Sequence, residues 1–210
     1  MREWQTSDHA AAYLERAERV PHRAAGEATL IEELPARVRR VLDLGSGDGR
    51  LLGLVLAARP DAEGIALDFS PPMLARLRDR FGASPAVRIV AHDMDQPLPA
   101  LGPFDAVVSS FAIHHLPDAR KRALYEEIWN ALEPGGVFCN LEHVLPSSPR
   151  AHARFLEAMN IAPGDEDPSN ILLDVHTQLE WLRAIGFEDV DCQWKWRELA
   201  LLTGRKKQVG

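Results

Sequence analysis

Short, nearly continuous apolar runs alternate with amphipathic stretches through the middle of this 210-residue chain. The apolar runs occupy residues 38–44, 64–67, 87–91, 104–109 and 136–141. A strand covered by helices on both faces is apolar on both faces, so such runs predict the buried strands of a parallel sheet. Helical patterns lie between them at residues 50–58, 70–81 (with Ser70 as the expected N-cap) and 118–132. We therefore expect an α/β fold with a doubly wound, mostly parallel sheet and helices on both faces.

The last third of the chain departs from this alternation. A helix at residues 151–159 and an acidic loop at 162–170 indicate an insertion near the edge of the sheet. A helix at 174–185 then leads to two strand-like runs, 187–194 and 196–203, with almost no connection between them. Two such runs predict a closing hairpin.

The composition favours one domain. Apolar residues make up 46% of the chain, enough for a core, and the formal net charge is -7. This excess of acidic residues gives the chain no net positive charge to attract nucleic acid or an anionic membrane, so a nucleic-acid partner is disfavoured. Cys139 and Cys192 fall in predicted strands and are interpreted as small buried hydrophobes. Because no apolar run approaches the roughly 18 residues that span a bilayer and residues 1–15 lack a signal-peptide core, we expect a cytoplasmic protein.

The first predicted strand is followed by three glycines spaced two apart, Gly45, Gly47 and Gly49. Glycine has no Cβ, so such a turn can adopt positive φ and press its backbone against a ligand. Taken alone, a turn without a ligand is the better interpretation. Asp68 and Asp93 end the next two predicted strands, and ligands of a doubly wound sheet bind at those strand ends. Asp68 suits the hydroxyls of a ribose, and Asp93, beside Met94, suits an adenine.

The glycine spacing separates two classes of nucleotide-like cofactor. A dinucleotide-binding turn has the pattern Gly-x-Gly-x-x-Gly, and Arg50 stands where its last glycine would fall. Asp43 and Asp48 would repel a pyrophosphate but could meet an ammonium group and a sulfonium-bearing chain. The sequence therefore predicts a cationic cofactor.

Several segments together resemble the successive motifs of the class I S-adenosylmethionine-dependent methyltransferases: residues 41–49, Asp68, Asp93 and residues 104–109. Residues 132–136 resemble the turn before that family's fifth strand, and the closing hairpin resembles its reversed seventh strand. The resemblance implies a seven-stranded sheet of order 3-2-1-4-5-7-6 with strand 7 antiparallel. It also implies S-adenosylmethionine as the cofactor and, for the small-molecule type, a small-molecule acceptor.

The resemblance assigns one group of residues to the reactive end of the cofactor. Gly45, Ser46 and Gly47 would lie against its methionine portion. The backbone at Ser109 and Phe111 would line the methyl end.

A second group would hold the nucleoside. The resemblance puts Asp68 on the ribose hydroxyls, Phe69 and Met73 beside the adenine, and Asp93 with Met94 on the adenine amino group and ring. A helix-capping carboxylate is the weaker alternative for Asp68, because the expected N-cap follows it. For Phe69 and Met94, plain core packing stays an open alternative.

Methyl transfer from a sulfonium mainly needs alignment, and it needs a base only if the acceptor holds a proton. The titratable residues after the fourth and fifth predicted strands are His114, His115, Glu142 and His143. Histidine can take a proton near neutral pH, so His114 and His143 are the candidate bases, although a structural or substrate-lining role stays open for each. His115 is assigned to cofactor-side packing. The spacing gives no recognisable ligand set, so we expect no metal.

The N-terminal segment predicts a lid. Residues 7–33 are rich in Ala, Glu, Arg and Leu and are interrupted by Pro21, which indicates two helices. In small-molecule members of the family such helices close over the site, and here they carry Tyr13, His22 and Arg23. Arg23 could pair with the cofactor's carboxylate, and an ordinary surface arginine is the competing interpretation.

The acceptor pocket would be built from Trp4, Phe155, Met159 and the loop at residues 162–170, whose composition favours a small, partly hydrophobic acceptor. The expected divisions of the single domain are a lid (1–35), a cofactor-binding core (36–143), an acceptor cap (144–173) and a closing helix and hairpin (174–210).

The expected function is methyl transfer to O, N or C of a small acceptor by a monomer or homodimer. The alternatives are a cofactor-modifying enzyme, an RNA or protein methyltransferase, and a non-catalytic S-adenosylmethionine-binding protein. Residues 109–112 do not form the Asn/Asp-Pro-Pro-Tyr motif of amino-group methylation, so methylation of nucleic-acid bases is disfavoured.

Overall fold

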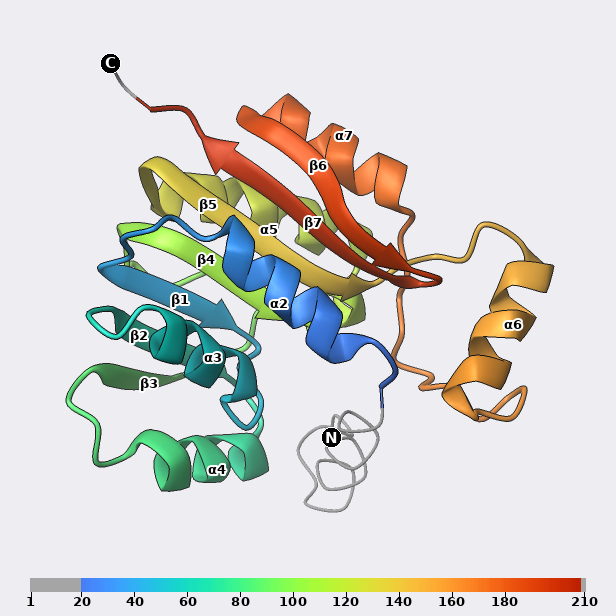
Figure 1. Cartoon of the computed structure of the whole chain (residues 1–210), viewed down its shortest axis with the longest axis horizontal. Coiled ribbons are helices and arrows are strands. Elements are labelled where there is room, and N and C mark those ends of the chain that lie inside the picture. Colours follow the sequence, from blue (N-terminus) through green and yellow to red (C-terminus); the bar gives the residue numbers. More distant parts are fainter. Residues whose placement is uncertain (1–19, 209–210) are drawn as a thin grey trace.

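The computed structural model describes residues 20–208, which form a seven-stranded sheet. The strands are β1 (Arg40–Leu44), β2 (Glu63–Asp68), β3 (Val87–Ala91), β4 (Phe104–Ser110), β5 (Leu132–His143), β6 (Phe187–Trp196) and β7 (Leu199–Lys206). Their order is β3-β2-β1-β4-β5-β7-β6, and β7 runs antiparallel to β5 and β6 while the other neighbours are parallel (Figure 1). This confirms the predicted fold, strand order and reversed strand.

Helices cover both faces of the sheet (Figure 1). They are α2 (Arg23–Glu33), α3 (Arg50–Ala58), α4 (Pro71–Phe81), α5 (Asp118–Ala131), α6 (Pro149–Met159) and α7 (Val175–Ile185), with a short 3-10 helix η2 (Ile113–His115) after β4. The first three pack on one face, α5 and α7 on the other, and α6 stands beyond the end of the sheet near the β6–β7 turn. None of these described helices is long and apolar enough to cross a membrane.

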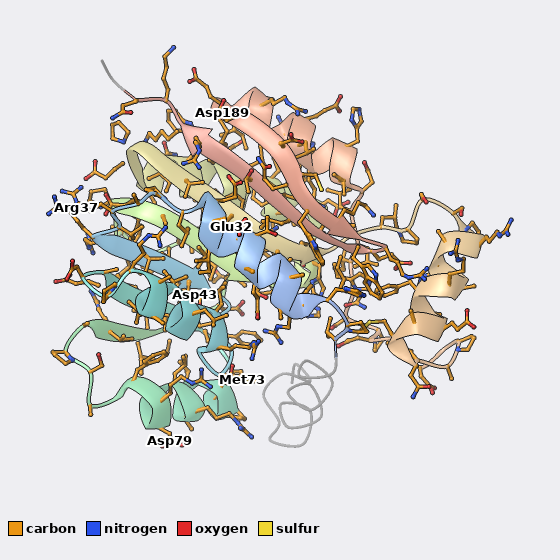
Figure 2. All side chains as sticks on the ribbon, viewed as in Figure 1. Glu32, Arg37, Asp43, Met73, Asp79 and Asp189 are labelled. Atoms are coloured by element: carbon orange, nitrogen blue, oxygen red, sulfur yellow. The ribbon has the colours of Figure 1, made fainter. Side chains whose placement is uncertain are left out.

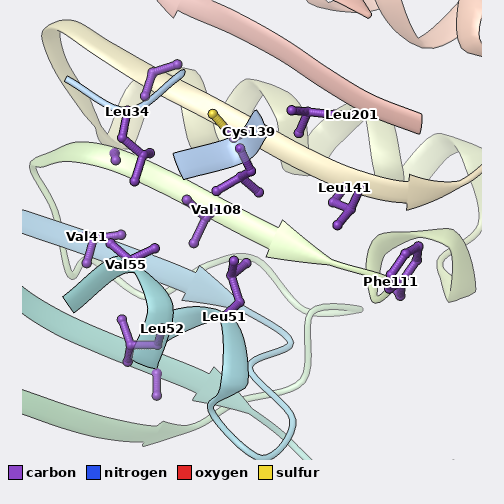
Figure 3. Close-up of a cluster of buried hydrophobic side chains, with 14 of the residues drawn as sticks. Leu34, Val41, Leu51, Leu52, Val55, Val108, Phe111, Cys139, Leu141 and Leu201 are labelled. Carbon is purple, nitrogen blue, oxygen red and sulfur yellow. The ribbon is translucent and has the colours of Figure 1, made fainter. Parts of the chain in front are cut away.

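The near-continuous apolar strands bury side chains on both faces, as predicted. On the α2 and α3 side, Val41, Val108, Cys139 and Leu201 come from four neighbouring strands and lie in one cluster with Leu52 of α3 (Figure 3). All five side chains are fully buried. Alternate residues of the same strands enter a second cluster beneath α5 and α7.

The start of β5 differs from the sequence prediction. The strand begins at Leu132, directly after α5, and not at residue 136. Leu132 pairs with Phe104, and the register then shifts so that Ala106 pairs with Val137. Gly135, with φ +81, allows this bulge. The predicted turn is therefore an irregular part of the strand itself, because backbone pairing continues across it.

The closing hairpin is confirmed, but its turn lies further along the chain. β6 continues to Trp196 and β7 starts at Leu199, so Arg197, with φ +53, occupies the turn. Register shifts between Glu188 and Asp191 and between Cys192 and Trp194 add residues to β6. Such bulges break the alternation from which strand ends are inferred.

The residues that bound α7 and α4 differ in whether they cap the helix. Asp174 caps α7 through the Thr177 N–H at 2.9 Å, and Gly186, with φ +117, ends that helix after Ile185, the last residue of the predicted helix. Ser70 precedes α4, but its side chain makes no capping hydrogen bond. The first two residues of α4 are prolines, which have no N–H to cap.

A buried polar link ties α5 to its neighbours and gives a stability prediction. The Tyr125 hydroxyl donates to Gln178 Oε1 at 2.7 Å and accepts from Asn140 Nδ2 at 3.4 Å. Tyr125→Phe should lower the free energy of unfolding by about 1–3 kcal/mol, since both partners stay buried without it. Urea denaturation measures this. Glu126→Gln, at an exposed position on the same helix, should change it by less than about 0.5 kcal/mol, and equal losses in the two variants would contradict the assignment.

Candidate active site

The glycine turn after β1 is held in a conformation that other residues rarely adopt. Gly45 and Gly47 have φ of +66° and +56°. A Cβ on Gly45 would lie 2.3 Å from Ala112 Cβ, whereas a Cβ on Gly47 would meet nothing within 4 Å. The turn therefore packs tightly at its first glycine and leaves open space at its second.

Ser46 fixes this turn to the end of β2. The Gly45 and Ser46 N–H groups both donate to the Leu67 carbonyl, at 2.9 and 3.0 Å. Ser46 Oγ donates to the Asp43 carbonyl at 2.8 Å and accepts from the Leu67 N–H at 3.0 Å. The hydroxyl is thus engaged within the protein, and the side chain supports the turn.

A first cavity of about 510 Å³ opens over this turn at the carboxyl ends of β1 to β4. It contains eight of the predicted cofactor residues: Gly45, Gly47, Asp68, Phe69, Met73, Asp93, Met94 and Phe111. His115, which was assigned to cofactor-side packing, also lines it. Figure 2 shows Met73 at the start of α4.

Asp68 is bound by backbone groups at both oxygens. The Gly47 N–H donates to Oδ2 at 2.8 Å and the Ser70 N–H donates to Oδ1 at 2.9 Å. Burial raises the pKa of Asp68, against the lowering effect of these bonds. Each carboxylate oxygen retains a second lone pair, so the group can still accept hydrogen bonds from a ligand.

Two predicted residues lie behind the first cavity and do not line it. Asp43 is 1% exposed, its Oδ2 makes no hydrogen bond among the described residues, and burial raises its pKa to about 7 (Figure 2). Ser109 is fully buried and its Oγ donates to the Leu44 carbonyl at 2.8 Å. Strand pairing places β1 and β4 side by side, which buries these two positions.

Arg23 is paired inside the protein. Its Nε donates to Glu27 Oε1 at 2.8 Å, and Arg50 binds both oxygens of Glu27 at 2.8 and 2.7 Å. Burial opposes ionisation of Glu27, but the bonds to Arg50 and Arg23 outweigh it and lower its pKa. Arg23 is not among the residues that line the first cavity, although its guanidinium lies 5.6 Å from the centre of the Phe111 ring. This pairing links α2 to the first residue of α3.

The loop after β3 is anchored by a pair that sequence reasoning missed. Arg120 donates to the Met94 carbonyl at 2.7 Å and to the Gln96 carbonyl at 3.0 Å. Its partner Glu127 accepts from the Leu98 N–H at 2.9 Å. Two charged residues seven apart on an amphipathic helix suggest a solvated face, so no local signal marks them as loop anchors.

A second cavity, of about 640 Å³, adjoins the first and shares Phe111, His115 and Pro168 with it. Phe155, Met159 and several residues of the 162–170 loop line it, so these predicted acceptor-pocket residues come together. Trp4 and Tyr13 lie outside the described residues.

His114 and His143, the two predicted bases, both line the second cavity. His114 Nδ1 makes a short hydrogen bond with Glu142 Oε1. Burial opposes ionisation of Glu142, but the His114 ring outweighs it and lowers the pKa of that carboxyl. Burial and the adjacent His114 lower the pKa of His115 to about 3, so its imidazole stays neutral.

Comparison with known proteins decides the family. A methyltransferase-domain family model matches residues 41–136. An uncharacterized methyltransferase of Mycobacterium tuberculosis (strain ATCC 25618 / H37Rv) is 35% identical over 121 residues, or 58% of this chain and 59% of its own. A chloroplastic 2-methyl-6-phytyl-1,4-hydroquinone methyltransferase 2 of Oryza sativa subsp. japonica is 32% identical over 75% of this chain and 41% of its own. Residues 41–136 therefore form a methyltransferase domain, and the chain is similar to class I S-adenosylmethionine-dependent methyltransferases, as its sequence motifs indicated.

Solved structures of the family share its fold. An O-methyltransferase family protein from Burkholderia thailandensis superposes with a TM-score of 0.75 at 18% identity, covering 99% of this chain and 62% of that one. Human N-acetylserotonin methyltransferase in complex with S-adenosylmethionine gives 0.70 at 18% identity, covering 98% and 58%. The cofactor of the family is S-adenosylmethionine, as predicted. The chain spans 59% and 41% of the two curated relatives above.

The buried carboxyl of Asp43 gives a pH prediction. Its folded pKa of about 7 lies above the ordinary value of 3.8, so the folded state binds more protons than the unfolded state between these values. The contribution of Asp43 to stability without cofactor should therefore fall as pH rises from 4 to 7. Asp43→Asn removes this contribution, so its free energy of unfolding relative to wild type should rise across that range by up to roughly 4 kcal/mol.

Urea denaturation at several pH values between 4 and 7 tests this. Exposed Asp61→Asn is the matched control and should follow wild type. A constant difference between Asp43→Asn and wild type would mean that Asp43 titrates normally.

Proposed function

We propose that this chain transfers the methyl group of S-adenosylmethionine to a small, partly hydrophobic acceptor. One observation carries the proposal: two cavities meet at Phe111 and His115, one built on the glycine turn and the other on a histidine backed by a carboxylate. A donor in the first and an acceptor in the second would face each other across this shared wall. Alignment of this kind is the main requirement of an in-line displacement.

The cofactor would lie in the first cavity. The open space beside Gly47 admits the methionine portion, and Asp68 has lone pairs left for the ribose hydroxyls. Asp93 and Met94 line the same cavity at the end of β3, where an adenine would lie, with Phe69 and Met73 beside it. The unpartnered Oδ2 of Asp43 behind the turn leaves a buried carboxyl that a cationic cofactor would offset.

Three of the predicted cofactor residues act in this proposal as supports. Ser46 and Ser109 are held by backbone carbonyls, and Arg23 is held by Glu27. We propose that they shape the turn, the adjoining strand and the lid helix α2. The division into lid, core, cap and closing hairpin remains our proposed organisation of one domain.

His114 is the proposed base. Because Glu142 is bonded to Nδ1, that nitrogen carries the proton whenever the ring is neutral, and Nε2 is then left to accept. When bound, the cofactor supplies a methyl group on a positively charged sulfur, which leaves as a neutral thioether. The acceptor oxygen or nitrogen bonds to the methyl carbon, and its proton passes to Nε2 of His114. The pair matches the general arrangement of a base oriented by a carboxylate.

A non-catalytic binding protein is the second candidate, and the cavity beyond Phe111 argues against it, since cofactor binding alone does not need that space. The hydroquinone methyltransferase relative is named for a small acceptor, which supports the small-molecule proposal. With a net charge of -7 and free cysteines, we also propose a cytoplasmic monomer or homodimer without a nucleic-acid substrate.

Binding of S-adenosylhomocysteine tests the first cavity. At a concentration 100 times its dissociation constant it should add about 2.7 kcal/mol of stability and raise the melting temperature. Asp68→Ala should abolish that rise, because the ribose hydroxyls lose their acceptor. Exposed Asp61→Ala is the control and should keep it. No rise in wild type would exclude the proposed cofactor site.

Turnover tests the base. His114→Ala should lower kcat by about 10²- to 10⁴-fold for a hydroxyl acceptor. Affinity for S-adenosylhomocysteine should stay within about twofold of wild type, since His114 does not line the first cavity. His176→Ala, at an exposed position on α7, should match wild type. Wild-type kcat and an unchanged pH profile in His114→Ala would remove this residue as the base.

A further inference from the structure

Glu198, in the turn between β6 and β7, is a buried carboxylate that the proposed methyl transfer does not use. Two histidines face it. His143 Nε2 lies 3.2 Å from Oε2, and His152 Nδ1 lies 3.1 and 3.2 Å from the two oxygens. A buried charge is costly unless it is paired, so these rings hold the compensating charge.

His152 is the ring that carries this charge. Its Nδ1 faces Glu198, and its Nε2 lies 3.4 Å from Glu166 Oε2 on the cap loop. A neutral imidazole has one N–H, so donation to two carboxylates requires the protonated form. Burial would lower the pKa of His152, but the bonds to Glu198 and Glu166 outweigh it and raise that pKa.

Because His152 compensates the charge of Glu198, the contact of His143 with Glu198 needs only one proton, donated from Nε2. Its other nitrogen, Nδ1, is then an acceptor. That atom makes no hydrogen bond to any residue between positions 20 and 208, and His143 lines the second cavity. The acceptor nitrogen is therefore available to a ligand.

His114 repeats this arrangement with its nitrogens exchanged. Nδ1 is bonded to Glu142, Nε2 makes no hydrogen bond to another described residue, and His114 lines the same cavity. The rings of His114 and His143 lie edge to face with their centroids 5.8 Å apart. One cavity wall thus presents two imidazole acceptors, each fixed by its own buried carboxylate.

We propose that the acceptor is a small aromatic compound carrying two hydroxyl groups, one for His114 and one for His143. The inference rests on the proposed function and specifies its substrate class. Two imidazole nitrogens that accept hydrogen bonds are best matched by a ligand with two hydrogen-bond donors. A ligand without the second donor would leave one desolvated nitrogen unpaired. The aromatic ring of the acceptor would pack against Phe155 and against Phe111 at the shared wall. The Phe155 ring centre lies 5.1 Å from that of His143.

The two hydroxyls have different fates in this proposal. The first gives its proton to His114 Nε2 while its oxygen forms the bond to the methyl carbon, and the sulfur keeps the electron pair of the broken carbon–sulfur bond. The second keeps its proton and donates to His143 Nδ1. The product is the monomethyl ether, S-adenosylhomocysteine and one proton. His143 is then a specificity-determining residue.

Matched pairs of acceptors test this. We would compare the benzenediols with phenol and the naphthalenediols with naphthol, measuring release of S-adenosylhomocysteine by the full chain. At least one diol should exceed its single-hydroxyl partner in kcat/KM by about tenfold or more. Calorimetric titration of the same compounds into protein saturated with S-adenosylhomocysteine gives the same ratio in Kd, independently of turnover.

Two variants test whether the preference for a diol depends on His143 and Glu198. His143→Phe should bring the diol-to-single-hydroxyl ratio close to one, in turnover and in binding. Glu198→Gln keeps the size and shape of this side chain, but its amide can donate a hydrogen bond to His143 Nε2. The His143 proton can then move to Nδ1, which no longer accepts from the second hydroxyl. The diol-to-single-hydroxyl ratio should therefore fall in this variant as well. His176→Phe, an exposed histidine on α7, should keep the wild-type ratio. A wild-type ratio near one, or a ratio that His143→Phe leaves unchanged, overturns the inference.

The failure of this inference can be told apart from that of the proposed function. Binding of S-adenosylhomocysteine without transfer to any diol would overturn the inference and leave cofactor binding intact. Absence of that binding in wild type would overturn the proposed function, and the inference with it.

Discussion

The attachment of the glycine turn to the end of β2 is the constraint on which the site depends. Two N–H groups of the turn converge on the Leu67 carbonyl, and the Gly47 N–H binds Asp68. Neighbouring parallel strands bring these segments together although they are more than twenty residues apart. This hydrogen-bonded attachment requires positive φ at Gly45, and a side chain at that position would also clash with Ala112. Backbone geometry, more than side-chain chemistry, therefore shapes the floor of the first cavity.

Buried carboxylates organise the rest of the site. Glu27, Glu142 and Glu198 are each almost fully buried, and each is paired with an arginine or a histidine. Because an unpaired charge would be far more costly than a paired one, each carboxylate restricts the position and proton of its partner. The pairs therefore contribute more to orientation than to net stability. Through Glu142 and Glu198, this determines which nitrogens remain as acceptors at the second cavity.

The cap does more than the sequence indicated. Its loop was assigned to the acceptor pocket alone, yet Ser169 and Ile171 line the first cavity and Pro168 lines both. Buried Lys121 holds the loop by donating to the Ile171 carbonyl at 2.5 Å, and the Ile171 N–H donates to the His114 carbonyl at 3.0 Å. The same segment thus contacts the wall of the donor cavity and the base, so we expect cap residues to influence both ligands.

Local patterns predicted the α/β class and eight of the residues that line the first cavity, since apolar runs, the glycine turn and the acids at strand ends are read directly from the sequence. The family resemblance of these motifs added the strand order and the cofactor. Hairpin and β5 boundaries were misplaced where bulges break the alternation. Only the tertiary structure showed that Ser109 is buried away from the first cavity, that Arg23 is paired with Glu27, and that His143 and His152 meet at Glu198. Ser109 and the histidines at Glu198 depend on partners distant in the chain, which no local pattern encodes, and Glu27, although four residues from Arg23, is fixed there by Arg50, 23 residues away.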